Sequence, residues 1–257
     1  MKANKITSRH AEILRLLQQN GSMSVADLAA GLSVSEETIR RDAASLEKRG
    51  DVNKLHGALS VPHHFGEAPY ERRMRERPTA KSAIARAAVE LVADGDSLII
   101  DTGSTTHFFA RELRVRRNLT VITNSTEIAR TLAAVRGNTI YLAGGEILAD
   151  NGAAYGPTAV DFIARFSVTH AVLSIGALDA TAGPLDANLN EAEYGAMAIS
   201  RAQHCMMLAD SNKFGQSALV KVCNYSDIDT LVTDAAPDAK FQAVLAAAGT
   251  RLVIAGL

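Results

Sequence analysis

Residues 97–113 combine residue types that can hold an anion. The segment reads SLIIDTGSTTHFFAREL, which is a short apolar strand, a turn of small polar residues and the start of a helix. Backbone N–H groups at a helix N-terminus lack helical partners, and the helix dipole favours negative charge there. Gly103 allows close approach of the backbone, and its neighbours supply donors on short side chains: Thr102, Ser104, Thr105 and Thr106. This pattern favours a phosphate-binding turn, although small residues also form ordinary strand-to-helix turns.

Small or polar residues also follow other apolar segments of the chain. Together with Asp101 they are Thr123, Asn124, Gly144, Gly145, Gly176 and Asp210. In open parallel sheets ligands bind beyond the carboxyl ends of the strands, so we expect several of these positions to converge on one pocket. Lys213 follows one such end and can offer a positive charge to an anion held by residues 102–106. The glycine-rich stretch 143–156 is expected to form a flexible wall.

The N-terminal part of the chain has the pattern of a helix-turn-helix motif over residues 24–43. Ser24 and Ser35 stand where they can cap two short helices, and a turn containing glycine lies between these helices. We also expect both serines to be among the DNA-binding residues. A preceding helix is predicted over 6–20, with its apolar residues largely on one side: Ile6, Ile13, Leu14, Leu16 and Leu17. These three segments predict a small helical bundle.

The second helix of this motif carries Thr38, Arg40 and Arg41 near its start. The first turns of a recognition helix enter the major groove of DNA, where arginine pairs with guanine N7 and O6 and small hydroxyl groups reach phosphates or bases. A plain helical hairpin with a solvated charged face is the alternative. The cap, the turn and the basic residues occur together at the offsets that DNA binding needs, which favours double-stranded DNA as a partner.

From residue 79 onward, helices alternate with short apolar strands. The predicted helices are 79–93, 105–114, 125–136, 157–166, 190–203 and 237–248, and the predicted strands are 97–101, 119–123, 139–143, 170–176, 204–210, 229–234 and 251–256. Continuous apolar strands between helices predict an α/β domain with a mainly parallel sheet covered by helices on both faces.

The two patterns predict a DNA-binding domain over 1–60 and an α/β domain over 79–257, joined by a linker over 61–78 that is rich in proline, glycine and arginine. The charge is divided in the same way. Residues 1–88 hold 15 Lys and Arg against 10 Asp and Glu, a net +5, whereas residues 89–257 hold 12 against 18, a net −6. His63 and His64 have no further ligands at metal-binding spacing, so we interpret them as solvated linker residues.

The composition predicts a soluble globular protein. The chain has 257 residues, of which 47% are hydrophobic, enough for a sizeable core. Cys205 and Cys223 fit neither a metal site nor a disulfide framework, so we expect reduced thiols in a cytoplasmic protein. No apolar run reaches the length of a membrane span, and the first ten residues precede no apolar segment, so we expect neither export nor membrane attachment. No cofactor or metal site is predicted.

Residues 24–50 resemble the helix-turn-helix of the DeoR family of bacterial transcriptional repressors, above all in the run TIRRD at 38–42. In that family the recognition helix leads to a wing that ends in His-Gly-Gly-Ala, matched here by Lys54, Leu55, His56 and Gly57. The resemblance implies a winged helix-turn-helix in which Lys54 and His56 contact DNA. The sequence departs from the family at Ala58 and Leu59, and alanine tolerates a positive φ less well than the second glycine of the family.

The resemblance continues through the α/β domain. The segments DTGSTT (101–106), ITNS (122–125), LAGGE (142–146) and ADSNKFG (209–215) are similar to effector-domain motifs of the family, in the same order. They imply a sugar-phosphate-sensing domain related in fold to ribose-5-phosphate isomerase. Carried over residue by residue, the resemblance places the following residues at the effector site: Asp101, Gly103, Ser104, Thr105, Thr106, Asn124, Gly144, Gly145, Glu191 and Lys213.

Further stretches, such as NEAEYGAMAI at 190–199 and LVTDAAP at 231–237, are most similar to the family subgroup that controls glycerol 3-phosphate metabolism. The resemblance implies a repressor that leaves its operator when a phosphorylated metabolite binds, either glycerol 3-phosphate or another sugar phosphate. Selectivity must come from side chains around the carbon chain, for which we expect Leu185, Glu191 and Phe214. Helix-turn-helix proteins read paired half-sites, so a homo-oligomer is also expected.

Two other functions remain open from the residues alone. A sugar-phosphate isomerase or deaminase-like enzyme could use Asp101, Glu191 and Glu193 as acid and base groups. A metabolite-binding module without regulatory output is the other possibility. The complete DNA-reading module favours the repressor, because an enzyme would not need it.

Overall fold

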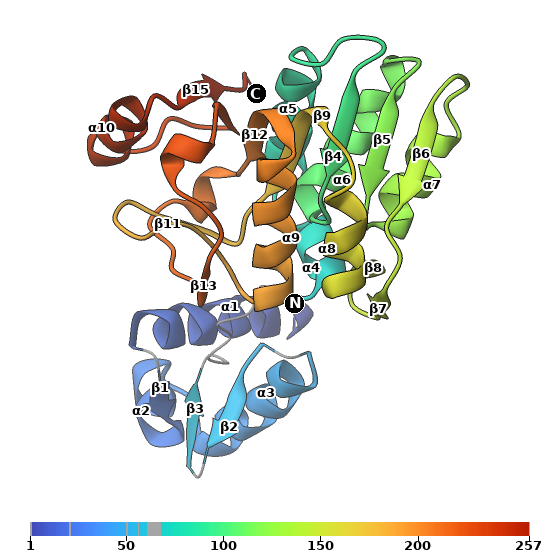
Figure 1. Ribbon diagram of the computed structural model, residues 1–257. Helices are drawn as coiled ribbons and strands as arrows, with labels where there is room; N and C mark the ends of the chain where they lie inside the picture. The colour runs from blue at the N-terminus through green and yellow to red at the C-terminus, as the bar shows by residue number, and fades with distance from the viewer. Residues whose placement is uncertain (1, 21, 50, 56, 61–67, 257) are drawn as a thin grey trace. The chain divides into compact units, whose positions relative to one another are not determined.

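A computed structural model describes residues 2–20, 22–49, 51–55, 57–60 and 68–256, without the side chains of 2–7, 18–20, 22, 55 and 60 (Figure 1). The chain forms two compact units, Met1–His64 and Phe65–Leu257. Five residues singled out from the sequence lie wholly or by their side chains outside this description: the side chains of Ile6 and Leu55, the wing residue His56, and the pair His63 and His64.

The first unit packs three helices against a three-stranded antiparallel sheet. Its helices are α1 (Lys2–Asn20), α2 (Val25–Gly31) and α3 (Glu36–Lys48), and its strands β1 (Ser22–Ser24), β2 (Asn53–Leu55) and β3 (Ala58–Ser60) pair in the order β1-β3-β2. The core of this unit consists mainly of Ile13, Leu17, Leu28, Ile39, Leu46 and Leu59. The hairpin β2–β3 follows α3 directly, which confirms the predicted winged helix-turn-helix.

The second unit is built on a seven-stranded sheet in which every neighbouring pair is parallel. In sheet order its strands are β15 (Arg251–Ile254), β14 (Thr230–Thr233), β12 (Ala202–Leu208), β9 (Val168–Ser174), β4 (Ser97–Ile100), β5 (Thr120–Thr123) and β6 (Thr139–Leu142). Each of the seven predicted strands corresponds to one of them. The chain enters the sheet at β4, between β9 and β5, so polar residues that follow neighbouring strands come from distant parts of the sequence.

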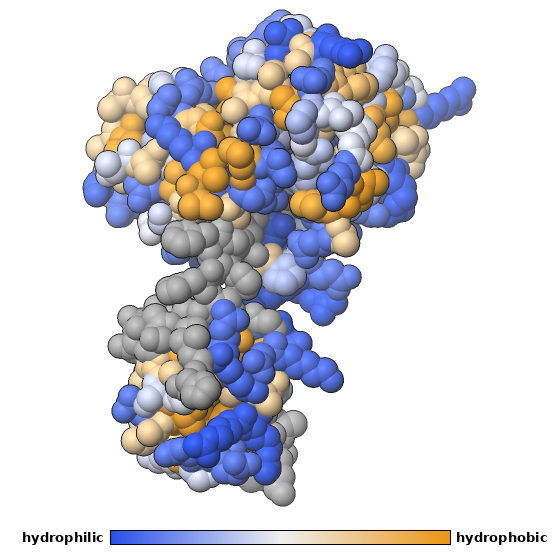
Figure 2. All heavy atoms as spheres, turned by 60° about the horizontal axis from the view of Figure 1, so that its bottom comes forward, coloured by the Kyte–Doolittle hydropathy of each residue, from blue (hydrophilic) through white to orange (hydrophobic). Residues whose placement is uncertain are grey.

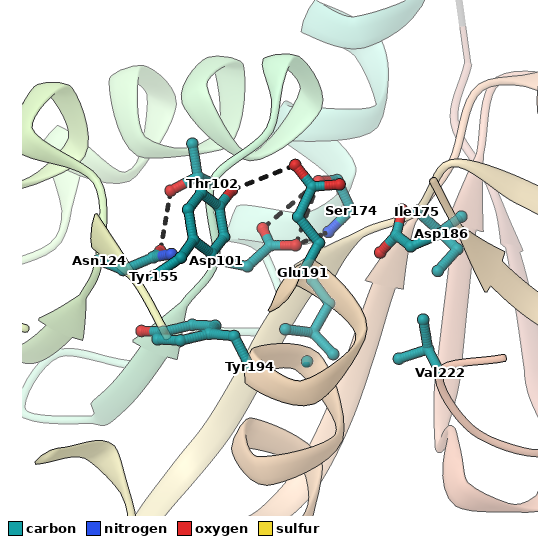
Figure 3. A pocket seen from close by; sticks show the side chains of 12 residues that line it. Asp101, Thr102, Asn124, Tyr155, Ser174, Ile175, Asp186, Glu191, Tyr194 and Val222 are labelled. Atoms are coloured by element: carbon teal, nitrogen blue, oxygen red, sulfur yellow. Dashed lines mark hydrogen bonds between the residues drawn. The ribbon is translucent and has the colours of Figure 1, made fainter. Parts of the chain in front are cut away.

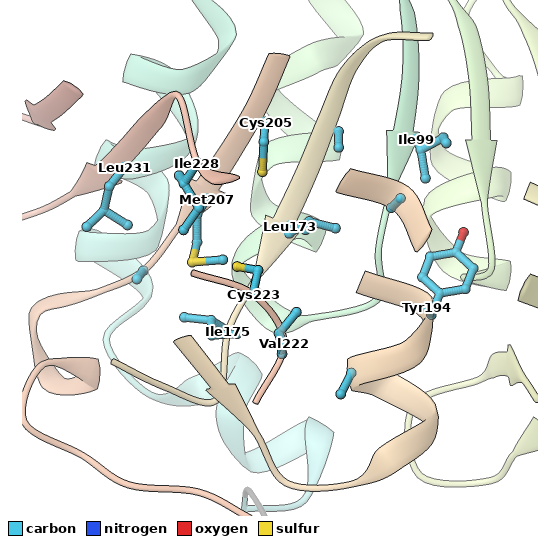
Figure 4. Packing of buried hydrophobic residues seen from close by; sticks show 14 of the residues in the cluster. Ile99, Leu173, Ile175, Tyr194, Cys205, Met207, Val222, Cys223, Ile228 and Leu231 are labelled. Atoms are coloured by element: carbon cyan, nitrogen blue, oxygen red, sulfur yellow. The ribbon is translucent and has the colours of Figure 1, made fainter. Parts of the chain in front are cut away.

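Helices cover both faces of this sheet. Successive side chains of a strand point to opposite faces, so neighbouring residues of one strand pack against different helices. Leu98 and Ile100 pack with α5 (Pro78–Val89), α6 (Ser104–Glu112) and α7 (Thr126–Ala133). On the opposite face Ile99 packs with α8 (Pro157–Ile163), α9 (Leu189–Ser200) and α10 (Ala239–Ala248). Cys205 and Cys223 lie in this second cluster as buried, unbridged thiols (Figure 4).

Several short strands beside the main sheet were not predicted. The stretch expected to be a flexible wall contains the hairpin β7 (Glu146–Leu148) and β8 (Ala153–Tyr155), which corrects that expectation. A small antiparallel sheet is formed by β10 (Ala177–Asp179), β11 (Gly183–Asp186) and β13 (Val220–Lys221). These segments lack the continuous apolar runs between helices that reveal the strands of the main sheet.

The segment predicted as a linker contains helix α4 (Tyr70–Arg75), which belongs to the second unit and contacts α6. None of the residues of α4 is fully buried, so the helix has no apolar stripe that would reveal it in the sequence. It is held by polar contacts instead. No described helix is both long enough and apolar enough to cross a membrane.

Candidate functional site

Helix α3 exposes its first turns and buries its apolar side. The Ser35 hydroxyl accepts a hydrogen bond from the Thr38 N–H and caps the helix. Ile39 is buried, whereas the side chain of Arg41 is 82% exposed. Glu37 lies 3.9 Å from the Arg41 guanidinium, a weak pairing in water. The arginine can therefore reach an external partner at little cost.

The other predicted DNA contacts have partners within the unit. Arg40 pairs with Glu36 at 2.6 Å, and Lys54 in β2 pairs with Glu47 at 2.6 Å. Ser24 accepts a hydrogen bond from the Asp27 N–H at 2.9 Å and thereby caps α2. The two predicted contact serines, Ser24 and Ser35, therefore hold helix ends in this structure.

The wing tolerates the departure from the family motif. Gly57 has a φ of +73°, a conformation that L side chains rarely adopt, and open space surrounds it. Ala58 is paired with Leu55 as the first residue of β3, and it is not among the described residues with positive φ. Among the described residues of the wing, the left-handed conformation is thus needed only at Gly57.

A pocket at the carboxyl ends of β4, β5 and β9 collects four of the predicted effector-site residues. Asp101 and Thr102 follow β4, Asn124 follows β5, and Glu191 reaches the pocket from α9. Figure 3 shows the three strand-end residues facing the side chains of α9. Other lining residues are Tyr155, Ser174, Ile175, Asp186, Tyr194 and Val222.

Hydrogen bonds fix the orientation of these side chains (Figure 3). The Asp101 carboxylate accepts the Ser174 N–H at 2.9 Å and the Ser174 hydroxyl at 3.2 Å. The Thr102 hydroxyl donates to the side-chain amide oxygen (Oδ1) of Asn124 at 2.8 Å. On the other side, the Tyr155 hydroxyl donates to the Glu191 carboxylate at 3.3 Å. The pocket therefore offers carboxylate acceptors beside phenol groups, a set that suits a ligand rich in hydroxyl groups.

Burial alters the protonation of the pocket. It raises the pKa of Asp101 to about 7, and the nearby charge of Glu191 adds to this effect, while hydrogen bonds from Ser174 oppose it. Burial also raises the pKa of both lining phenols, Tyr155 and Tyr194, so they stay neutral donors. Near neutral pH Asp101 can thus switch between an acceptor and a donor.

The predicted phosphate-binding turn begins helix α6, and its residues are buried. Ser104 and Thr105 are 5% and 4% exposed, and Thr106 is fully buried. The Thr106 hydroxyl donates to the backbone carbonyls of Asp101 and Gly103, so it serves the turn itself. With these side chains buried, the donors that such a turn could offer an anion are the backbone N–H groups of the first helical turn.

Gly103 is required for a reason other than the predicted ligand contact. Its φ is −161°, which any residue adopts, but a Cβ there would lie 1.9 Å from the Ser174 hydroxyl oxygen. Because Gly103 has no side chain, the Ser174 hydroxyl has room to donate to the Asp101 carboxylate.

The remaining predicted effector residues lie apart from the pocket lining that the structure describes. Gly144 is open to solvent, and at Gly145 a Cβ would lie 2.7 Å from the Tyr155 carbonyl oxygen, so this glycine packs against β8. Lys213 is the last residue of the short 3-10 helix Ser211–Lys213, which follows β12. Burial lowers the pKa of Lys81, the negative charge of Asp210 opposes this, and the positive charge of Lys213 adds to it.

Comparison with known proteins matches both units. Residues 9–65 match the DeoR-like helix-turn-helix domain, and residues 76–235 match the DeoR C terminal sensor domain. The chain belongs to the DeoR family. It is 32% identical over 241 residues to the glycerol-3-phosphate regulon repressor of Escherichia coli (strain K12), covering 94% of this chain and 96% of that protein.

Other DeoR-family relatives have other names. The transcriptional repressor CsqR of E. coli is 30% identical, with 92% of this chain and 91% of CsqR covered, and AccR of Agrobacterium fabrum is 30% identical, with 91% and 92% covered. Among solved structures, part of the chain is similar to ribose 5-phosphate isomerase A of Methanocaldococcus jannaschii, with 21% identity, a TM-score of 0.40, and 54% and 55% of the two chains covered.

The sensor domain of this DeoR-family chain also uses residues that the sequence analysis missed. Tyr155 was hidden in the glycine-rich stretch that forms the unpredicted hairpin. Ser174 lies at the end of a predicted strand, but two residues before the polar end that was chosen from the sequence. Tyr194 follows Glu191 by three positions, a spacing that places both on one side of a helix and that could have revealed it.

Proposed function

We propose that this DeoR-family chain is a transcriptional repressor of a carbon-utilisation operon, and that it leaves its operator when glycerol 3-phosphate binds. The observation that carries the proposal is the pocket at the ends of β4, β5 and β9, beside the start of α6, in a chain whose α3 exposes Arg41. A ligand changes operator affinity only by binding two conformations of the repressor unequally.

The pocket supports a small polyol phosphate as the effector. The N-terminus of α6 favours the anion, while Glu191 and Asp101 accept hydrogen bonds from hydroxyl groups on the carbon chain. Lys213 lies outside the pocket lining in this structure, and we propose that it contacts the phosphate from the loop after β12, because a charge-assisted contact would strengthen phosphate binding. The 32% identity to a glycerol-3-phosphate regulon repressor over almost the whole chain supports the same effector.

The exposed edge of the sensor sheet supports a homo-oligomer. Among the described strands β6 pairs with β5 alone, and its residues Tyr141 and Leu142 are 42% and 46% exposed. Ile147 and Leu148, which follow in β7, are also exposed. On the face drawn in Figure 2, hydrophobic residues reach the surface of the second unit in patches between hydrophilic ones. A second copy of the chain would cover such an edge and bring a second recognition helix to the operator.

The direct test is a titration of the protein–operator complex. The full chain is first used to select a duplex from a random library, and its affinity is then measured with glycerol 3-phosphate, fructose 1-phosphate or glycerol. We expect glycerol 3-phosphate to lower operator affinity by about tenfold or more and glycerol to have no effect. A response only to fructose 1-phosphate would overturn the assignment of glycerol 3-phosphate as the effector. It would still support the proposed function as a repressor.

The same mixtures test the enzymatic alternative. Asp101 and Glu191 share the pocket, but Glu193 lines a different hollow with Asp161 and Met197. Chemical conversion of a sugar phosphate by the purified chain, with no effect on its DNA binding, would favour the enzyme.

A further inference from the structure

Helix α4 is attached to the sensor at its first residue. The Tyr70 N–H donates to the carboxylate of Asp150 at 3.1 Å, and the Tyr70 hydroxyl forms a hydrogen bond of 2.9 Å with Nδ1 of His107 in α6. Asp150 lies in the turn of the β7–β8 hairpin. The start of α4 thus contacts two separate elements of the sensor.

The segment is attached again just after α4. Arg77 donates to the carboxylates of Asp210 at 3.1 Å and Asp234 at 2.5 Å, and to the side chains of Ser211 and Asn212. Both carboxylates are buried. Arg77 has a φ of +50°, which costs free energy for a residue with a side chain, so these four contacts must hold it there.

Each attachment point is adjacent to an element of the proposed effector site. Asp150 precedes Asn151, whose amide donates to the Tyr155 hydroxyl at 3.1 Å, and that hydroxyl donates to Glu191 in the pocket. His107 follows the phosphate-binding turn directly in α6. The residues that hold Arg77 lead into Lys213.

The attachment of α4 is polar and incompletely packed. No residue of the helix is fully buried, and an open cavity separates it from the sensor, lined by Tyr70, Met74, His107, Arg111, Thr126 and Asp150. Release of α4 would therefore expose little additional apolar surface, and the loss of a few hydrogen bonds is enough to shift its position.

We propose that α4 is the element through which effector binding changes operator affinity. This inference rests on the proposed repressor function. A ligand hydroxyl that occupies the Glu191 carboxylate displaces the Tyr155 hydroxyl, which weakens the hold of Tyr155 on Asn151 and lets Asp150 move away from Tyr70. In the sequence α4 follows the DNA-reading unit after residues 61–67. We assign tight operator binding to its docked position and weaker binding to its release.

The test weakens the attachment at Tyr70, and leaves the pocket and the contacts of Arg77 unchanged. Tyr70→Phe deletes the bond to His107, and Asp150→Asn weakens the acceptor for the Tyr70 N–H. Asp161→Asn, on the exposed side of α8, is the matched control for loss of one carboxylate. Arg73→Pro, which breaks α4 itself, is a second and stronger variant. Hydrogen exchange of the α4 amides reports whether the helix has been released.

The variants with faster α4 exchange should bind the selected duplex about tenfold more weakly than wild type with no effector present. Addition of glycerol 3-phosphate should then change their operator affinity less than twofold, while calorimetry finds no weaker binding of glycerol 3-phosphate. Asp161→Asn should behave as wild type. Operator affinity and response equal to wild type, in a variant whose α4 amides exchange faster, would overturn the role of α4.

The two proposals fail differently. A wild-type chain that binds the duplex but ignores glycerol 3-phosphate would overturn only the effector assignment, because operator affinity without effector still tests α4. A wild-type chain that binds no duplex would overturn both proposals.

Discussion

Asp101 affects both the chemistry of the pocket and the stability of the fold. Its carboxylate closes the end of β4, accepts two hydrogen bonds from Ser174, and faces the charge of Glu191. Its pKa of about 7 lies well above the value of about 4 for an unfolded chain. Between these values the folded protein keeps a proton that the unfolded chain has released, so the contribution of Asp101 to stability is lost as pH rises toward 7.

Asp101→Asn should abolish this dependence, because an amide stays neutral. The melting temperature of the variant, relative to wild type, should rise between pH 5 and pH 8. Asp161→Asn, an exposed carboxylate on α8, serves as the control and should show no such trend. A constant difference between Asp101→Asn and wild type across this range would mean that Asp101 is already ionised at pH 5.

Arg41 is the residue at which DNA reading can be tested. Its guanidinium is 82% exposed and only loosely paired, so Arg41→Ala should leave the fold intact. If the arginine pairs with a base, operator binding should weaken by about 1 to 3 kcal/mol, with the loss of discrimination at one base pair. Arg86→Ala, an exposed arginine of the sensor, should bind the operator as wild type does. If Arg41→Ala and Arg86→Ala bind the operator equally well, α3 is not the helix that enters the major groove.

At the scale of elements, the turn from β4 to α6 depends on a glycine that leaves room for a neighbour. Gly103→Ala would place a Cβ 1.9 Å from the Ser174 hydroxyl oxygen, and we expect a loss of about 1 to 3 kcal/mol in the free energy of unfolding. Gly144→Ala is the control, since nothing lies within 4 Å of a Cβ there. In denaturant titrations, the double variant with Ser174→Gly should lose less stability than the two single variants combined. Additive losses would show that the contact does not limit the turn.

The strands of the main sheet could be predicted because they form continuous apolar runs between helical segments, although several of them have only four residues. All seven strands of the main sheet and the caps of α2 and α3 were predicted, as were four residues of the pocket. The hairpin that carries Tyr155 was not, because Ile147 and Leu148 are apolar but exposed and follow no alternation. Helix α4 was missed because polar contacts with Asp150 and His107 hold it, and these partners lie far away in the sequence.

At the scale of the whole molecule, the two edges of the main sheet differ in the apolar surface that they expose. β6 and the adjoining β7 expose four large hydrophobic residues, Tyr141, Leu142, Ile147 and Leu148, whereas Ile254 is the exposed hydrophobic residue of β15 at the other edge.

Tyr141→Asp should therefore weaken association of the chain, because it places a charge in the middle of the apolar edge. Sedimentation velocity should find a dimer or larger assembly for wild type and a smaller species for the variant at the same concentration. Ile254→Asp, at the opposite edge, should sediment as wild type does. If Ile254→Asp dissociates the assembly and Tyr141→Asp does not, the copies meet at β15.

The attachment of α4 to the sensor also determines where this gene could recombine with that of a relative. A hybrid joined within residues 61–67 would keep Tyr70 and Arg77 with the loops that hold them. A hybrid joined at residue 79, the boundary that composition suggests, would replace Tyr70 and Arg77 with a segment from the relative. The loops of the sensor that hold these two residues would then lose their partners. Crossovers that combine the operator of one repressor with the metabolite of another are therefore tolerated most readily within the codons for residues 61–67, before α4 and not after it.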